Sequence, residues 1–311
     1  MSLESYYWGK YQLSKLKDMF NKWRKASVFP SINEIEWRHN ELAARLKQIH
    51  DYQVKDDLPI SGLKIETQKN ILELLAYIQP MKILNANKVR LGSAGDGGYV
   101  QLNDLNGITL GLSFGIKDDD SWDLEIASKG ITVQQFDYTV DRSPSSHPLL
   151  SFNKKKISGV TTEGSISLQD LIKSHRPSSG PDIILKIDIE GSEWEVFDNS
   201  AEEQLSKIKQ ILCEFHGLSR LNDCGFYTLA HRVLKKLNKH FIPYHVHGNN
   251  AANIVNIANV TFPDVIEVSF ANRASYSYIE SNDIYPTDLD SPNVPELPDI
   301  FLGQFQFRSS K

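Results

Sequence analysis

The segment DIILKIDIEGSEWEVF, residues 182–197, is the part of the sequence best suited to chemistry. Its apolar run predicts a buried strand over 182–188, with Asp188 and Glu190 at the carboxyl end. Open α/β sheets bind ligands at that end of their strands. Two carboxylates there can hold a divalent ion, orient an acceptor or remove a proton. The alternative is structural, with Glu190 capping the next helix and Asp188 bonded to backbone.

The segment QILCEFHG, residues 210–217, places Glu214 and His216 at the end of another predicted strand. With Asp188 they would form a cluster over adjacent strand tips. A neutral imidazole can take a hydroxyl proton near neutral pH, and the same three groups can ligate a metal. A lone buried histidine is more often structural, so the weight of this interpretation rests on the neighbouring Glu214.

A third histidine segment, YHVHGNN, covers residues 244–250. His245 and His247 have a spacing of two and therefore share one face of a strand. His247 is closer to the strand end and is the better candidate to contact an acceptor. A polar strand end in a turn explains it equally well.

The segment GITLGLSFGIKDDDSW, residues 107–122, predicts a strand, a turn at Gly115 and then a helix. A glycine lets a ligand approach the backbone, and the helix start presents free N–H groups. The turn has one glycine and three aspartates, 118–120, which do not suit a pyrophosphate. They suit a ligand with a cationic centre, although Asp120 could simply cap the helix.

Asp137 ends the next predicted strand, 22 residues after Gly115. An acidic group at this place can accept both hydroxyls of a ribose, the usual way such folds hold adenosine. Many strands also end in aspartate for turn reasons. Together with the Gly115 turn, Asp137 indicates a nucleoside site.

Several segments together resemble the FkbM-type methyltransferases over roughly residues 88–275, and LKIDIEGSEWEVF is the most specific of them. The segments are RLGSAGDGGYV (90–100), LSFGIKDDDSWDLEIASKG (112–130), QQFDYT (134–139), LKIDIEGSEWEVF (185–197), CEFHG (213–217) and HVHGNN (246–250). The resemblance implies S-adenosylmethionine as cofactor and O-methylation of a hydroxyl, often on a sugar or glycan. One departure is Lys117, where relatives often have glycine.

The resemblance also implies roles for individual residues. The predicted cofactor contacts are Asp96, Gly97, Gly98, Tyr99, Phe114, Gly115, Asp120 and Asp137. The predicted acceptor and catalytic residues are Asp188, Glu190, Glu214, His216 and His247. If the reaction needs a divalent cation such as Mg²⁺, we expect Asp188, Glu214 and His216 to hold it. Either His216 or Asp188 would take the proton of the hydroxyl.

The elements that must position these residues alternate between strand and helix. The sequence predicts strands at 108–114, 131–136, 182–188, 208–214 and 241–247, and helices near 121–129, 167–174, 193–205 and 226–239. This alternation is typical of an α/β fold with a largely parallel sheet. Combined with the resemblance, it predicts a Rossmann-like class I methyltransferase fold with a mostly parallel seven-stranded sheet.

The first 80 residues lie largely outside this pattern and predict a helical N-terminal region before a catalytic domain at 81–311. Residues 1–25 carry six basic and two acidic side chains on an aromatic-rich helix, which either rests on an anionic membrane surface or docks on the main domain. A capped helix from Ser31 to about 49 either pairs with a second subunit or packs as a small subdomain. A third helix is expected at 66–78. From about 286 a proline-rich tail either lies across the domain or is mobile.

Composition limits the function further. A net charge of −5 argues against a nucleic-acid partner, whose phosphates require a basic surface. No apolar run reaches the length of a membrane span, no secretory signal is visible, and two cysteines suit a reducing compartment, so we expect a cytoplasmic protein, whether or not residues 1–25 touch a membrane. A nicotinamide-dependent oxidoreductase would need a glycine-rich turn that is missing here. A non-catalytic binding or scaffold protein of the same fold is the other alternative.

Overall fold

A computed structural model describes residues 62–175 and 180–307 of the chain. The predictions for the basic helix at 1–25, the capped helix from Ser31, and their membrane or subunit contacts lie outside the described residues. Within the described residues no helix is both long enough and apolar enough to cross a bilayer.

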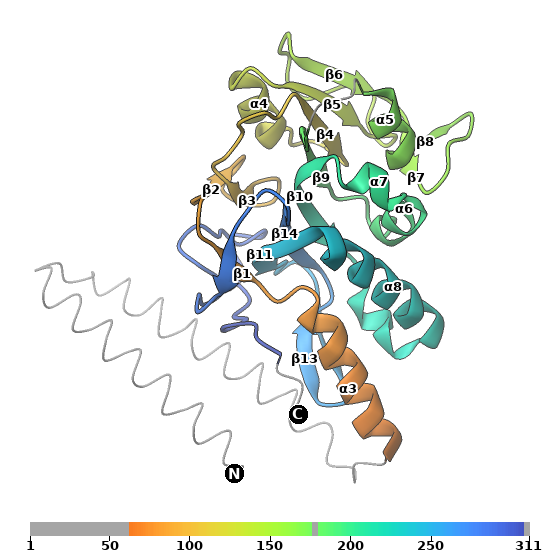
Figure 1. Cartoon of the computed structure of the whole chain (residues 1–311), viewed down its shortest axis with the longest axis vertical. Helices are drawn as coiled ribbons and strands as arrows, with labels where there is room; N and C mark the ends of the chain where they lie inside the picture. Colours follow the sequence, from red (N-terminus) through yellow and green to blue (C-terminus); the bar gives the residue numbers. More distant parts are fainter. Residues whose placement is uncertain (1–61, 176–179, 308–311) are drawn as a thin grey trace, which may run out of the picture. The chain divides into compact units, whose positions relative to one another are not determined.

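A seven-stranded sheet forms the centre of the molecule, as the sequence predicted (Figure 1). In spatial order its strands are β11 (Phe241–Gly248), β14 (Ile266–Asn272), β10 (Ile208–Phe215), β9 (Ile183–Ile187), β4 (Leu110–Phe114), β5 (Thr132–Phe136) and β6 (Leu150–Asn153). β14 runs antiparallel to both of its neighbours, and the other paired strands are parallel. The mixed α/β architecture with a mostly parallel sheet is therefore confirmed.

The central strands are apolar on both faces because each face is covered by a separate core. In β9, Ile183, Leu185 and Ile187 pack into one core, whereas Ile184 packs into the other. In a strand, alternate side chains point to opposite faces. A strand covered on both sides therefore reads as a continuous apolar run, which is why β9 stood out in the sequence.

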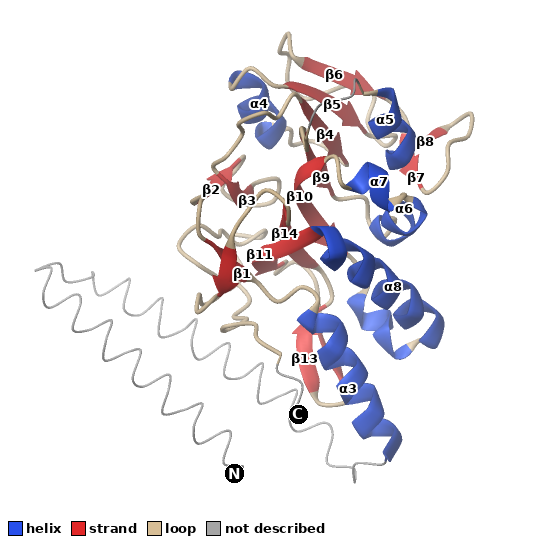
Figure 2. Cartoon of the chain, viewed as in Figure 1, coloured by secondary structure: helices blue, strands red, loops and turns tan. Residues whose placement is uncertain are grey.

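Helices cover both faces (Figure 2). α4 (Ser121–Ser128) packs on one face through Trp122 and Ile126. The helices of the other core are α3 (Gly62–Ala76), α5 (Leu168–Ser174), α6 (Glu193–Asn199), α7 (Glu202–Leu205) and α8 (Cys224–His240). The single helix expected at 193–205 was wrong: Ser200 and Ala201 have extended backbone angles and divide it into α6 and α7.

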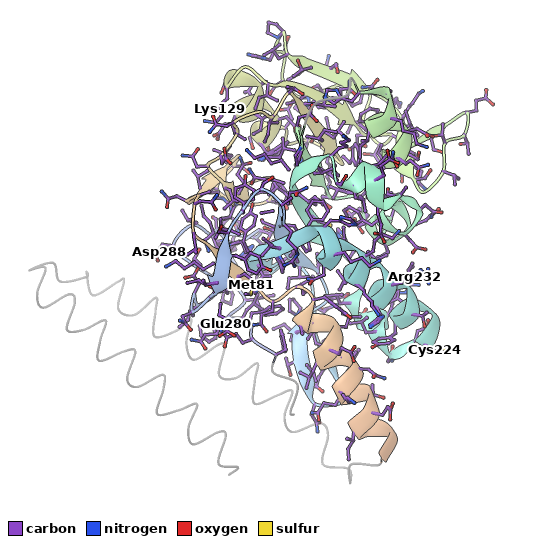
Figure 3. The ribbon with its side chains drawn as sticks, in the orientation of Figure 1. Met81, Lys129, Cys224, Arg232, Glu280 and Asp288 are labelled. Atoms are coloured by element: carbon purple, nitrogen blue, oxygen red, sulfur yellow. The ribbon has the colours of Figure 1, made fainter. Side chains whose placement is uncertain are left out.

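Within residues 62–175 and 180–307, four short strand pairs lie outside this sheet. They are β1 (Met81–Ile83) with β15 (Tyr278–Glu280), β2 (Lys88–Leu91) with β3 (Tyr99–Leu102), β7 (Lys156–Ser158) with β8 (Ser165–Ser167), and β12 (Ile254–Ile257) with β13 (Val260–Pro263). Met81 faces Glu280 in the first pair, and both are labelled in Figure 3. The β2–β3 hairpin holds residues 92–98 at its tip. A small 3₁₀ helix, η1 (Leu218–Asn222), follows β10.

The proline-rich segment lies across the domain, one of the two expected arrangements. Tyr285 pairs with Gly303 in an isolated antiparallel bridge, which closes the intervening residues into a loop. We call residues 286–302 the C-terminal strap. Within it, Val294 N–H donates to Asn250 Oδ1, and the Asn250 amide donates to the Val294 and Leu297 carbonyls. The strap is therefore fastened to the loop that follows β11.

Candidate active site

The ends of β9 and β10 bring together the acids and the imidazole that the sequence singled out. His216 Nε2 lies 3.7 Å from Asp188 Oδ1, 3.5 Å from Glu190 Oε2 and 3.6 Å from Glu214 Oε2. The two strands are adjacent and parallel, so their carboxyl ends meet at one edge of the sheet. We call Asp188, Glu190, Glu193, Glu214 and His216 the strand-tip cluster.

Glu193 is a member of this cluster that the sequence analysis missed. Its side chain has no exposed surface, and its Oε1 lies 3.2 Å from His216 Nδ1. The backbone N–H groups of Ile189 and Gly191 donate to the same oxygen at 2.8 and 3.2 Å. Four carboxylates therefore surround one imidazole that retains some solvent exposure.

Charge in this cluster is poorly balanced. Burial raises the pKa of Asp188 to about 6, and the nearby His216 and Lys186 only partly offset this effect. Burial, followed by the charges of Asp188 and Glu267, raises the pKa of Glu214 well above its usual value. Two neighbouring carboxyl groups with raised pKa values compete for one proton. The cluster can therefore accept a proton, or a cationic group, at neutral pH.

The pKa of His216 is also shifted. Burial alone would lower it, but the hydrogen bond to Glu193 and the charges of Glu193 and Asp188 outweigh burial, and the net pKa is raised. The imidazole thus holds a proton more tightly than a free histidine does.

Lys186, which the sequence analysis also missed, lies beneath this edge. Lys186 belongs to β9, two residues before Asp188, and it is only 2% exposed. Its ammonium lies 3.5 Å from the Gly115 carbonyl oxygen and 5.6 Å from the centre of the Tyr99 ring. A buried cation at this place partly offsets the carboxylates of the cluster, as its lowering effect on the pKa values of Asp119 and Asp188 indicates.

A cavity of about 320 Å³ opens at the ends of β4, β5 and β9. Its wall combines acidic, basic and apolar side chains. The acids are Asp137, Asp188 and Glu190, the bases are Lys117, Lys155 and Lys156, and Phe136, Tyr138, Ile157 and Ile189 are the large apolar or aromatic residues. This volume lies in the range of small-molecule sites. The strand-tip cluster reaches the cavity through Asp188 and Glu190.

Asp137 lines this cavity and is strongly hydrogen bonded. Its Oδ2 accepts from the Lys117 N–H at 2.8 Å, and its Oδ1 accepts from the Thr139 N–H and hydroxyl at 2.7 and 2.6 Å. Burial would raise its pKa, but the bonds from Thr139 and Lys117 outweigh burial and hold the pKa below its usual value. Asp137 is therefore an ionised acceptor with a fixed orientation at the cavity wall.

Gly115 also lines the cavity, but the reason for glycine differs from the one expected. Its φ is +75°, and a Cβ atom would lie 1.7 Å from the Asp188 carbonyl oxygen. The residue must therefore be glycine because the tip of β9 packs directly against it. Contact with a ligand at this position remains a prediction.

The predicted cofactor turn at residues 96–99 lies at the tip of the β2–β3 hairpin. Arg90 braces the turn by donating to the carbonyl oxygens of Ser93 and Gly95. Gly98 packs so closely that a Cβ atom would lie 2.0 Å from the Ser93 carbonyl oxygen, and one on Gly97 would overlap the Asp119 carboxylate. The glycines thus fit the turn against the start of α4. None of these residues lines the described cavity.

Tyr99 connects this turn to the strand-tip cluster, and Asp96 connects it to the C-terminal strap. The Tyr99 hydroxyl donates to Asp188 Oδ2 at 3.4 Å, and burial raises the pKa of Tyr99 well above its usual value. Asp96 Oδ1 accepts from the Asn293 amide at 3.2 Å, and the same amide donates to Glu267 at 2.9 Å. The turn is therefore linked to the strand-tip cluster on one side and to the strap on the other.

Two further predicted cofactor residues, Phe114 and Asp120, also do not line the cavity. Phe114 is fully buried in the core, where its ring contacts that of Phe136 edge-on. Asp120 is 3% exposed and accepts hydrogen bonds from Gln135, from the Ser143 hydroxyl and from the Ser145 N–H and hydroxyl. Burial raises its pKa, but the serine bonds outweigh burial and lower it. Its carboxylate thus organises the loop after β5, a contact that the spacing of aspartates could not indicate.

His247 is placed among acids but is enclosed by the strap. Its ring is 1% exposed, with Nε2 2.9 Å from Asp299 Oδ1 and Nδ1 3.4 Å from Glu267 Oε2. His245 is likewise enclosed, with Nε2 2.7 Å from Asp290. Burial lowers the pKa of His247, but Glu267 and Asp299 outweigh it and raise the pKa well above its usual value. An acceptor contact by His247 remains a prediction.

A group for cation binding is also present among the described residues. Asp188, Glu193 and His216 each offer a ligand atom, and these atoms lie within 4.8 Å of one another. This group contains Glu193, whereas the sequence analysis named Glu214 with Asp188 and His216; a metal at either set of residues remains a prediction. An imidazole among the donors suits Mn²⁺ or Zn²⁺ better than Mg²⁺, which prefers oxygen ligands.

Comparison with known proteins agrees with this geometry. No curated protein matches the chain. A family model described as the methyltransferase FkbM domain matches residues 63–241, which contain nearly all of α3, the five parallel strands β4, β5, β6, β9 and β10, and the whole strand-tip cluster. The chain therefore belongs to the FkbM methyltransferase domain family.

Proposed function

We propose that this methyltransferase transfers a methyl group from S-adenosylmethionine to a hydroxyl group of a sugar or glycan. The observation that carries the proposal is the strand-tip cluster beside a cavity of small-molecule size, in a chain of the FkbM family. The finer description as a Rossmann-like class I methyltransferase fold belongs to the same proposal, and the mostly parallel sheet supports it.

Several residues of the cavity wall support the binding of S-adenosylmethionine. Asp137 presents fixed acceptor oxygens for ribose hydroxyls, and the aromatic and apolar wall suits an adenine ring. Asp188 and Glu190 face the same cavity and favour a positively charged group. When bound, S-adenosylmethionine supplies a methyl group activated by a cationic sulfur.

The chain itself supplies alignment and proton removal. The acceptor hydroxyl must be held against the methyl donor, and a well-aligned geometry accounts for much of the rate of such reactions. We propose that His216 Nε2 or the Asp188 carboxylate takes the hydroxyl proton, because Asp188 lines the cavity, His216 Nε2 lies 3.7 Å from its Oδ1, and the pKa values of both groups are raised. Glu190 and Glu214 orient the acceptor in this proposal.

A divalent cation stays a separate prediction. Asp188 and His216, with Glu193 or Glu214, would hold it, and its chemistry would be to polarise the acceptor hydroxyl. Treating the purified protein with EDTA tests this requirement. Full activity after chelation would exclude a metal, whereas loss of activity restored by Mn²⁺ would support one.

Two measurements test the proposed function. Isothermal titration should show binding of S-adenosylmethionine and no binding of NADH. Incubation with methyl-labelled cofactor and a panel of glycans should then transfer one methyl group to a hydroxyl. Binding of the cofactor without transfer to any acceptor would favour a scaffold protein, and failure to bind it would refute the proposal.

A further inference from the structure

We propose that Glu193 is a positioning residue that fixes the tautomer and the orientation of the His216 ring. The inference rests on the proposed function for its catalytic meaning, because His216 is there a candidate base. The structural part of the inference, that Glu193 fixes the His216 ring, rests on the contacts of Glu193 alone.

The hydrogen bonds assign the donor and the acceptor. Glu193 Oε1 accepts from the backbone N–H groups of Ile189 and Gly191, so this oxygen is fixed as an acceptor. His216 Nδ1 lies 3.2 Å from the same oxygen and must therefore donate its proton to it. In a neutral ring, Nε2 then carries the free lone pair.

The Nε2 lone pair faces the other carboxylates of the strand-tip cluster. Nε2 is 3.5–3.7 Å from carboxylate oxygens of Asp188, Glu190 and Glu214, distances too long for good hydrogen bonds. A substrate hydroxyl that donates to Nε2 would therefore satisfy a position that the described residues leave open.

The first turn of α6 holds His216 at two points. Glu193 contacts the ring, and the neighbouring Trp194 donates its indole N–H to the His216 carbonyl oxygen at 2.8 Å. Both side chains are buried. The ring and the main chain of His216 are thus held by consecutive residues of one rigid element, which is the arrangement needed to aim a base.

Glu193 keeps this position at a cost. Its other oxygen, Oε2, is buried without a hydrogen-bond partner among the described residues. An unsatisfied buried carboxylate oxygen destabilises a fold. An apolar side chain would avoid that cost, but it would leave the Ile189 and Gly191 N–H groups and His216 Nδ1 without this acceptor. The three contacts of Oε1 supply a reason for the carboxylate.

The test uses nitrogen NMR of the full chain labelled with ¹⁵N-histidine, without cofactor or acceptor, at alkaline pH where the ring is neutral. The His216 signals are assigned by their absence in His216→Gln. The expected result is the Nδ1–H form in the native protein and in Glu193→Gln, whose amide oxygen still accepts. Glu193→Ala should shift most of the ring to the Nε2–H form.

A matched control is Glu202→Gln. Glu202 also contacts a histidine, His240, at 3.1 Å, but this pair does not belong to the strand-tip cluster. Glu202→Gln should leave the His216 signals unchanged. A native protein with the Nε2–H form would overturn the proposal, even if Glu193→Ala does not fold. So would a folded Glu193→Ala that keeps the Nδ1–H form.

Methyl transfer separates this proposal from the proposed function. With the expected tautomers and an active native enzyme, Glu193→Ala should lose at least about 100-fold in kcat with little change in cofactor binding, while Glu193→Gln retains most activity. If the tautomers are as expected but His216→Gln keeps full activity, the positioning of the ring stands and His216 is not the base.

Discussion

His216 and His247 both contact carboxylates, but the two histidines differ in how far they are enclosed and therefore in the role we expect for them. His247 is 1% exposed and has an acid beside each ring nitrogen, one from β14 and one from the strap. His216 is 15% exposed, with one nitrogen bound to Glu193 and the other facing acids at 3.5 Å or more. His247 Nδ1 has no hydrogen-bond partner among the described residues, so what separates the two sites is enclosure: a ring enclosed between two acids stabilises a fold, whereas a partly exposed ring is accessible to a proton or a substrate.

Removing the His247 charge should give the largest effect on stability. In His247→Gln, the largely buried side chains of Glu267 and Asp299, which are 11% and 12% exposed, lose the cation between them. We expect a loss of about 3–5 kcal/mol in the free energy of unfolding, because an uncompensated buried charge is costly. Urea denaturation followed by circular dichroism measures it. A loss below about 1 kcal/mol would mean that this pair is not closed as described.

A change in the strand-tip cluster, next to the partly exposed His216, should affect the rate of methyl transfer more than the stability of the fold. Asp188→Asn should lower methyl transfer by at least about 100-fold while binding of S-adenosylmethionine survives. Its pKa of about 6 indicates a carboxyl group poised to exchange a proton, which an amide cannot do. Rate assays and cofactor titration on the same protein sample check both parts. Unchanged turnover would refute the role of Asp188.

The pH dependence of stability should follow His247. Its folded pKa is raised, so its contribution is fully present below the ordinary histidine pKa of about 6.5 and is lost as pH rises through the folded value. Melting temperatures measured from pH 6 upward should therefore fall more steeply for the native chain than for His247→Gln. Parallel curves for the two proteins would contradict this assignment.

The smallest effect is expected at a surface pair of the same kind. His240 Nε2 lies 3.1 Å from Glu202 Oε2, and the two side chains are 26% and 45% exposed. His240→Gln should leave the melting temperature and methyl transfer close to the native values, because exposed ion pairs contribute little. A large change at this site would show that contact with a carboxylate, rather than enclosure, determines the importance of a histidine.

Much of the architecture followed from the sequence because local patterns determine it. Five strands of the sheet and the apolar continuity of β9 were predicted, and the acids after β9 and β10 were expected to meet. β14 was not predicted, although it is buried along its whole length, and it supplies Glu267. The prediction of an arm at residues 1–80 remains a prediction, while α3 contributes Ile71 and Leu74 to the main core.

The contacts of the site were harder to predict because they join residues distant in the chain. His245 meets Asp290 and His247 meets Asp299 across 45 and 52 residues, and only the folded strap brings them together. Glu193 could have been suspected from its place in the first helical turn after Gly191, where backbone N–H groups are free to bind it. Lys186 gave a weaker signal, a single charge inside an otherwise apolar strand.

The absence of room for any side chain at Gly115 has a consequence for redesign. The main chain of Asp188 occupies that space. A shift of the Gly115 turn in the cavity wall would therefore also shift Asp188, a candidate base. An engineer who wished to admit a bulkier nucleoside would have to rebuild both loops together, since widening either alone would misalign the other.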